Sequence, residues 1–206
     1  MMHGAIGTVK YPLAALHHHG IMDDDNNHRR RLLDAMAKSV AEKGYGAVTI
    51  ADLAAEARVS KRSFYEQFRD KADCFIALYE MASLQSLKVL REALDPKQDW
   101  HEQVERALHA YLSALAKNPP LLCTLFIDIM AIGPSGLAAR RRSNERFADF
   151  IVSVVGQGMQ REQAVALVGG IHEWVLEAVE QQKVSALPAL AAPGARLVRA
   201  VIDGAR

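Results

Sequence analysis

Residues 49–71 read TIADLAAEARVSKRSFYEQFRDK, which is two short helical patterns separated by a turn. Thr49 predicts the start of a helix through Ala57, and Ser60 predicts the start of a second over residues 61–68. Each hydroxyl can accept a hydrogen bond from a backbone amide that the first turn of a helix leaves free. Two short helices joined by a turn of three to four residues are typical of a helix-turn-helix unit. Its small core would contain Ile50, Leu53, Val59 and Phe64.

The amino end of the second helix carries Ser60, Lys61, Arg62 and Ser63, which point outward in this arrangement. Lysine and arginine can pair with phosphates or with the N7 and O6 of guanine, and serine can bond to either. Residues 29–71 contain ten Lys or Arg and six Asp or Glu, whereas the rest of the chain has fifteen and eighteen. A basic headpiece on a mildly acidic body predicts that only this end meets DNA.

This stretch resembles the signature of the TetR family of transcriptional regulators. In that signature a threonine-capped helix, a turn like Ala-Gly-Val-Ser and an ending like Thr-Leu-Tyr-x-His-Phe precede a lysine. This signature is matched in order and spacing by residues 57–60, by residues 63–68 and by Lys71. The resemblance implies that the DNA backbone is clamped by Thr49, Tyr65, Gln67 and Lys71, and that the groove is probed by Ser60, Lys61, Arg62 and Ser63.

Three residues depart from the family pattern. Arg58 occupies the usual turn glycine, and a left-handed backbone there would cost about 1–2 kcal/mol. We include Arg58 among the candidate phosphate contacts. Arg62 stands where glycine is common, and Gln67 replaces a common histidine. These departures leave the fold intact but prevent transfer of any operator sequence.

Apolar residues at helical spacing dominate the rest of the chain, which predicts an all-α fold of about nine helices. We expect a flexible arm over residues 1–28, with Met22 as an alternative start, a helix-turn-helix domain over 29–72, and a helical effector-binding and dimerisation domain over 73–206. Besides the two helices above, the expected helices cover residues 29–43, 70–94, 99–117, 121–132, 137–155, 160–184 and 190–202.

The resemblance also implies a homodimer on a palindromic DNA operator and a small-molecule effector among the middle helices. Gly169 and Gly170, near Trp174, would let a partner helix approach closely, although a kinked helix is the alternative. Few charges fall among the candidate lining residues, so we expect a largely apolar or aromatic effector whose binding ends repression. These candidates, which could equally be ordinary core, are Trp100, Tyr111, Leu122, Cys123, Phe126, Met130, Phe147 and Trp174.

Other classes of protein have less support. Cys74 and Cys123 are far apart, which argues against a disulfide framework or a zinc ribbon. We find no P-loop, dinucleotide-binding or hydrolase motif, and expect no metal, cofactor or membrane span in a cytoplasmic protein. The three arginines of residues 140–142 are interpreted as a solvated helix start. The alternatives are a helical interaction module without DNA binding and, third, an enzyme with an unrecognised site.

Overall fold

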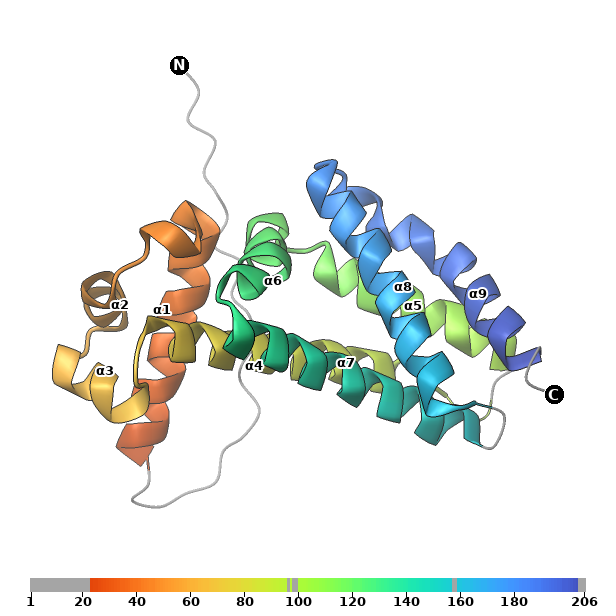
Figure 1. Ribbon diagram of the computed structural model, residues 1–206, viewed down its shortest axis with the longest axis horizontal. Helices are drawn as coiled ribbons and strands as arrows, with labels where there is room; N and C mark the ends of the chain where they lie inside the picture. Colours follow the sequence, from red (N-terminus) through yellow and green to blue (C-terminus); the bar gives the residue numbers. More distant parts are fainter. Residues whose placement is uncertain (1–22, 96, 98–99, 157–158, 204–206) are drawn as a thin grey trace.

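The computed structural model describes residues 23–95, 97, 100–156 and 159–203, and this part of the chain is all-α, as predicted (Figure 1). It contains nine α-helices and one 3-10 segment, with no strand in the ranges just given. In chain order these are α1 (Asp23–Ala47), α2 (Ile50–Ala57), α3 (Lys61–Gln67), α4 (Lys71–Glu92), α5 (Trp100–Leu115), α6 (Pro119–Ala131), α7 (Pro134–Val155), α8 (Arg161–Glu180), η2 (Val184–Leu190) and α9 (Ala191–Asp203).

Helix α1 begins six residues earlier than predicted. Residues 23–28, which we assigned to a flexible arm, are its first turns. The predicted end at Gly44 is confirmed as a break, because Gly44 has a φ of 73° inside the assigned helix. The rest of the predicted arm, residues 1–22, lies outside the described residues.

Prolines open two helices where the sequence analysis expected loops. Asn118 caps α6 by accepting a hydrogen bond from the amide of Leu121, and Pro119 follows as the first helical residue. Pro134 likewise opens α7 after Gly133. Proline suits the first turn because its missing N–H would be unpaired there in any case. The predicted starts at 121 and 137 were therefore too late.

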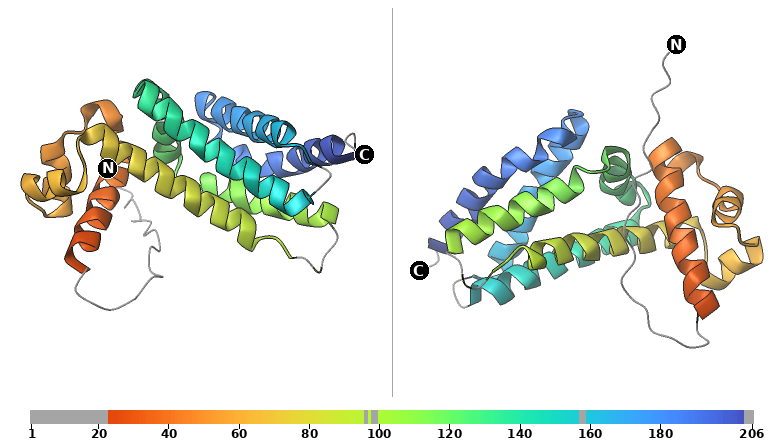
Figure 2. Two further views of the ribbon diagram at one scale, coloured as in Figure 1. Left: turned by 60° about the horizontal axis from the view of Figure 1, so that its bottom comes forward. Right: turned by 180° about the vertical axis from the view of Figure 1, so that it is seen from behind.

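The helices form a small headpiece and a longer body. Helices α1–α3 lie at one end of the molecule, and α4 leaves them to run along the body beside α7 (Figure 1). Helices α5, α8 and α9 form the second layer of the body, and α9 ends far from the headpiece, as the view from behind also shows (Figure 2). Helix α8 ends at Glu180 rather than 184, and the unpredicted η2 leads into α9.

Two apolar cores share two helices. In α4, Phe75 and Leu78 belong to the headpiece core, whereas Leu87 belongs to the body core. In α6, Leu125 packs into the headpiece core and Leu122 into the body core. The headpiece core therefore continues past the domain boundary predicted at residue 72. Helices α4 and α6 therefore connect the two cores.

Two parts of the body resemble membrane spans by length and composition. One is the segment Val184–Asp203, with a mean hydropathy of 1.2, and the other is the pair Glu102–Leu115 and Pro119–Ala131, bent by 92°. In the first, Leu187 and Ala195 are fully buried in the body core, and η2 and α9 both pack on α5. A core helix of a folded domain has the same composition, so the buried side of this segment is explained by the fold itself.

Candidate DNA interface and ligand cavity

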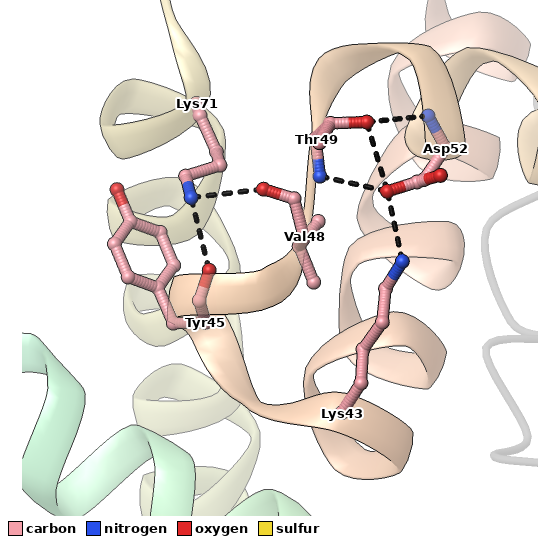
Figure 3. A network of polar contacts seen from close by, with 6 residues as sticks. All are labelled: Lys43, Tyr45, Val48, Thr49, Asp52 and Lys71. Atoms are coloured by element: carbon pink, nitrogen blue, oxygen red, sulfur yellow. Dashed lines mark hydrogen bonds and ion pairs between the residues drawn. The ribbon is translucent and has the colours of Figure 1, made fainter.

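The turn before α2 is held by reciprocal hydrogen bonds (Figure 3). The Thr49 hydroxyl accepts from the Asp52 amide at 3.2 Å, and the Asp52 carboxylate accepts from the Thr49 amide at 2.9 Å. The same carboxylate oxygen also accepts a hydrogen bond from the Lys43 ammonium at 2.8 Å. These bonds hold the pKa of Asp52 at about 2, with the bond from Lys43 as the largest cause. Thr49 is therefore a confirmed cap, and its contact with DNA remains a prediction.

Lys71 is turned toward the headpiece rather than outward. Its ammonium donates to the carbonyl oxygens of Tyr45 and Val48, both at 2.9 Å, and lies 4.2 Å from the centre of the Tyr45 ring (Figure 3). Carbonyl oxygens near the end of a helix lack a partner amide within the helix. Here Lys71 donates hydrogen bonds to them instead. A DNA phosphate would have to compete with these two carbonyl oxygens for the ammonium, so Lys71 is a weaker candidate for a DNA contact than the cations of α3.

The amino end of α3 is rigid and basic. The Ser60 oxygen accepts from the Ser63 amide at 2.9 Å and also bonds the Ser63 hydroxyl, which confirms Ser60 as the cap. Lys61 is exposed and has no hydrogen bond or ion pair within the described ranges. The Arg62 side chain is 90% exposed and lies 3.1 Å from Glu66, one turn on. Exposed pairs of this kind contribute little, so Arg62 can exchange Glu66 for a base or phosphate.

The other candidates on α3 lie on two sides of the helix. Tyr65 is 58% exposed and stacks edge-on against Phe64, which is fully buried in the headpiece core. Gln67 is half-buried, and its backbone oxygen accepts from the Arg29 guanidinium at 3.1 Å. Buried Phe64 fixes the rotation of α3, and this rotation leaves Tyr65 and the basic tip facing outward.

The turn between α2 and α3 has the predicted strain. Arg58 has a φ of 54° and a ψ of 48°, which is the left-handed conformation. The carbonyl oxygen of Arg58 accepts from the Arg31 guanidinium at 2.8 Å, and the Val59 amide donates back to the Ala54 carbonyl at 2.9 Å. Contacts from both sides thus hold a turn that a glycine would adopt more readily.

We predict that Arg58→Gly raises the stability of the protein. Relief of the left-handed backbone contributes about 1–2 kcal/mol, and the greater freedom of glycine in the unfolded chain offsets about 0.4–1 kcal/mol. A net gain of about 1 kcal/mol corresponds to a rise in Tm of roughly 2–4 °C for a protein of this size. Thermal unfolding followed by circular dichroism measures it. An unchanged or lower Tm would show that the Arg58 side chain stabilises the turn by other contacts.

A cavity of about 90 Å³ lies within the body between α4, α5, α7, α8 and α9. Of the eight candidates, Tyr111 and Phe147 line it, and six of the thirteen other lining residues show which helices surround it. These are Leu90 and Leu94 near the end of α4, Val104 on α5, Phe150 on α7, His172 on α8 and Val198 on α9.

The remaining candidates lie outside this lining. Leu122, Cys123 and Phe126 pack in the body core, and Met130 packs against the headpiece core. The Trp174 ring reaches α9 instead, where a Cβ on Gly194 would lie 3.8 Å from it. The side chain of Trp100 is outside the described part. The predicted set therefore placed too many residues of α6 in the cavity, because the face of α6 was unknown from sequence.

A chain of three polar side chains crosses the wall of the cavity. The Tyr111 hydroxyl lies 2.9 Å from Nε2 of His172, and Nδ1 of His172 lies 3.1 Å from the Asn144 oxygen. Because that oxygen only accepts, Nδ1 carries the proton and Nε2 accepts from Tyr111. Burial lowers the pKa of His172 to about 4 and raises the pKa of Tyr111. Both groups are neutral at pH 7.

This polar chain adjoins α6. The His172 ring meets the Phe126 ring edge-on, with 5.7 Å between centres, and the Phe147 ring in the same way at 5.6 Å. His172 was not among the candidate lining residues identified from the sequence. Its place in the cavity wall depends on how α5, α7 and α8 meet, for which the sequence offers no signal.

Comparison with known proteins gives a consistent result. Residues 32–78 match the profile of the family described as bacterial regulatory proteins, tetR family. The uncharacterized HTH-type transcriptional regulator YhgD of Bacillus subtilis is 28% identical over 130 residues, which cover 63% of this chain and 68% of that one. The fatty acid metabolism regulator protein of the same organism is 23% identical over 132 residues, covering 63% and 66%.

Solved structures share the fold over most of the chain. The transcriptional regulator FadR from Bacillus subtilis, in complex with stearoyl-CoA, superposes with a TM-score of 0.70 at 18% identity, covering 82% of this chain and 96% of that one. A TetR-like transcriptional regulator from Rhodococcus gives a TM-score of 0.61 at 24% identity, covering 84% and 96%. At these identities the likeness shows the fold.

Proposed function

We propose that the chain is a member of the family described as bacterial regulatory proteins, tetR family, whose profile residues 32–78 match, and that it represses transcription by binding a roughly palindromic operator as a homodimer. A small, largely apolar effector would end repression. The observation that carries the proposal is the basic tip of α3. There Lys61 and Arg62 are exposed on a helix whose start is capped by Ser60 and whose rotation is fixed by Phe64. Such a tip suits the major groove.

A second copy of the chain is proposed to cover α8 and α9. A largely apolar groove between these helices is lined by Gln163, Ala166 and Leu167 of α8 and by Leu197, Ala200 and Val201 of α9. A Cβ added to Gly169 would meet nothing within 4 Å, and α8 carries no non-helical residue within its assigned range. The glycine is thus not explained by a kink or by packing inside the chain. Dimerisation would set two α3 tips about 34–36 Å apart, one turn of DNA.

The effector is proposed to bind in the body cavity. Its walls expose apolar groups, and the hydroxyl of Tyr111 is already bonded to His172. The engineered cavity that binds benzene is about 150 Å³, so a cavity of about 90 Å³ must widen for a larger ligand. The structure of FadR with stearoyl-CoA supports an effector with an alkyl chain in this fold. Widening would move α4 and α7, and α4 reaches the headpiece core.

Substitutions at α3 test base recognition. Lys61→Ala or Arg62→Ala is expected to reduce discrimination between the operator and an operator with altered base pairs by about 1–3 kcal/mol, if that residue bonds guanine. Competition binding followed by fluorescence anisotropy measures the discrimination. A third variant, Lys71→Ala, should weaken binding of both DNAs equally and also lower Tm, because it removes the bonds to Tyr45 and Val48.

The matched control for Arg62 is Glu66→Gln, which removes the ion pair but keeps the guanidinium. This variant should retain discrimination. If Lys61→Ala and Arg62→Ala lowered affinity for both DNAs by the same factor, direct base recognition by the tip of α3 would be wrong. The protein would then bind by its charge alone, as a regulator of low specificity.

A further inference from the structure

Arg140 on α7 is a half-buried cation without a counter-ion. It lies one turn before Asn144, which bonds His172 in the cavity wall. Within the described ranges Arg140 has no hydrogen bond and no ion pair. Its charge nevertheless reaches two inner rings, since it contributes to lowering the pKa of His172 and opposes the rise in the pKa of Tyr79. Arg140 and Asn144 are four residues apart and therefore share the face of α7 that bonds His172 of α8.

Arg146, further along α7, has a buried nitrogen without a bond. Nη1 is the single buried side-chain nitrogen or oxygen among the described residues that has no hydrogen-bond partner. Nη2 of Arg146 lies 3.8 Å from Glu80 on α4, but the same carboxylate oxygen already accepts two bonds from Arg142, at 2.8 and 3.0 Å. Arg146 also opposes the rise in the pKa of Tyr79, as Arg140 does.

Arg140, Arg142 and Arg146 carry more positive charge than the one nearby carboxylate, Glu80, can balance. Glu80 is the acceptor for Arg142 and Arg146, so two guanidinium groups share one carboxylate, and Arg140 has no acidic partner among the described residues. A buried donor that lacks an acceptor costs about 1–3 kcal/mol, more when it is charged. The exposed neighbour Arg141 matches the solvated helix start expected from sequence, whereas Arg140 does not. A bound anion would satisfy both Arg140 and the free nitrogen of Arg146.

We propose that Arg140, assisted by Arg146, binds the anionic group of an amphiphilic effector whose alkyl part occupies the cavity lined by Tyr111, Phe147 and His172. This inference rests on the proposed effector site and identifies the class of molecule: an alkyl chain with a carboxylate or phosphate attached. Guanidinium groups bond both anions in paired geometry. A free fatty acid and an acyl thioester of a phosphorylated carrier are the two sources of such an anion.

Three probes of equal chain length test the proposal on the full-length chain: decanoate, 1-decanol and decanoyl-coenzyme A. At least one anionic probe is expected to bind about ten- to hundredfold more tightly than 1-decanol, the range for a hydrogen bond to a charged group. Calorimetry below the micellar concentration measures it. Tight decanoate indicates a carboxylate, and tight decanoyl-coenzyme A with weak decanoate indicates a phosphate. Equal affinity for all three, or no binding of any, would overturn the proposal.

Variants on α7 separate recognition from packing. Arg140→Gln should bring the anionic probes to the affinity of 1-decanol without changing 1-decanol itself, and Arg140→Lys should recover part of the difference. Arg141→Gln is the matched control, since Arg141 is exposed on the same helix, and it should bind like the unaltered protein. Equal losses in both glutamine variants, or an equal loss for 1-decanol, would overturn the assignment. Operator binding by the same samples tests the proposed function separately.

Discussion

Operator affinity is expected to fall by roughly three orders of magnitude when monovalent salt rises from about 50 to about 200 mM. The exposed cations at the tip and turn are Arg58, Lys61 and Arg62, so two protomers supply about six phosphate contacts. Each contact releases condensed counterions, and about six imply a log–log slope near −5. Lys71 would add about two contacts and bring the slope near −7, but its ammonium is held by two backbone carbonyls.

Fluorescence anisotropy over a range of salt concentrations measures this slope. The double variant Lys61→Ala with Arg62→Ala should reduce its magnitude by about 3 to 4, because about four contacts are lost. Lys88→Ala serves as the control, since Lys88 is exposed on α4 in the body and pairs with Glu92 at 3.6 Å. A slope near zero, or one unchanged in the double variant, would exclude α3 as the DNA-contacting helix.

Effector and operator are expected to weaken each other about a hundredfold, which corresponds to a coupling of about 2.7 kcal/mol. A ligand that binds both conformations equally shifts nothing, so the cavity must differ between them. The small volume of the cavity supplies such a difference, because a ten-carbon chain requires it to widen. The form described here would then be the one that favours operator.

Two helices connect the cavity to the headpiece. Leu90 and Leu94 line the cavity near the end of α4, and Phe75 near its start is fully buried in the headpiece core. Helix α6 runs between the two cores, with Phe126 against His172 on one side and Leu125 in the headpiece core on the other. The amide of Tyr45 at the end of α1 also donates to Asp128 of α6, at 3.2 Å.

Calorimetry of the tightest of the three probes, with and without saturating operator, measures the coupling. Its affinity should be about a hundredfold lower on the protein–DNA complex, and by reciprocity operator affinity should fall by the same factor in saturating probe. Arg140→Gln should leave the ratio intact while lowering both probe affinities. Equal affinities in the presence and absence of operator, for a probe bound in this cavity, would mean that the body does not control the headpiece.

The headpiece was predictable because its boundaries are fixed by local chemistry. Thr49 and Ser60 bond amides three residues away, so a short stretch of sequence contains both members of each cap. The left-handed turn at Arg58 followed from its position in the family pattern. What the sequence could not show was the inward turn of Lys71, because its acceptors at 45 and 48 lie more than twenty residues earlier in the chain.

The cavity was only partly predictable. Tyr111 and Phe147 were among the eight candidate lining residues and do line the cavity, whereas the four candidates of α6 pack in or against the two cores. Arg140 was interpreted as solvated, because three adjacent arginines at a helix start usually are. Their separation into half-buried Arg140, exposed Arg141 and Arg142 paired with Glu80 depends on the packing of α4 against α7.

The most direct test of a sequence-specific repressor is titration of the full-length chain against DNA from immediately upstream of its own gene, because such regulators often control themselves or a neighbour. Anisotropy provides the affinity and light scattering provides the mass of the complex. We predict saturation with two chains, or a multiple of two, and an affinity at physiological salt at least about a thousandfold above that for scrambled DNA of equal length, the lower end for specific binding. Equal affinity for both DNAs, or a complex containing a single chain, would contradict the account.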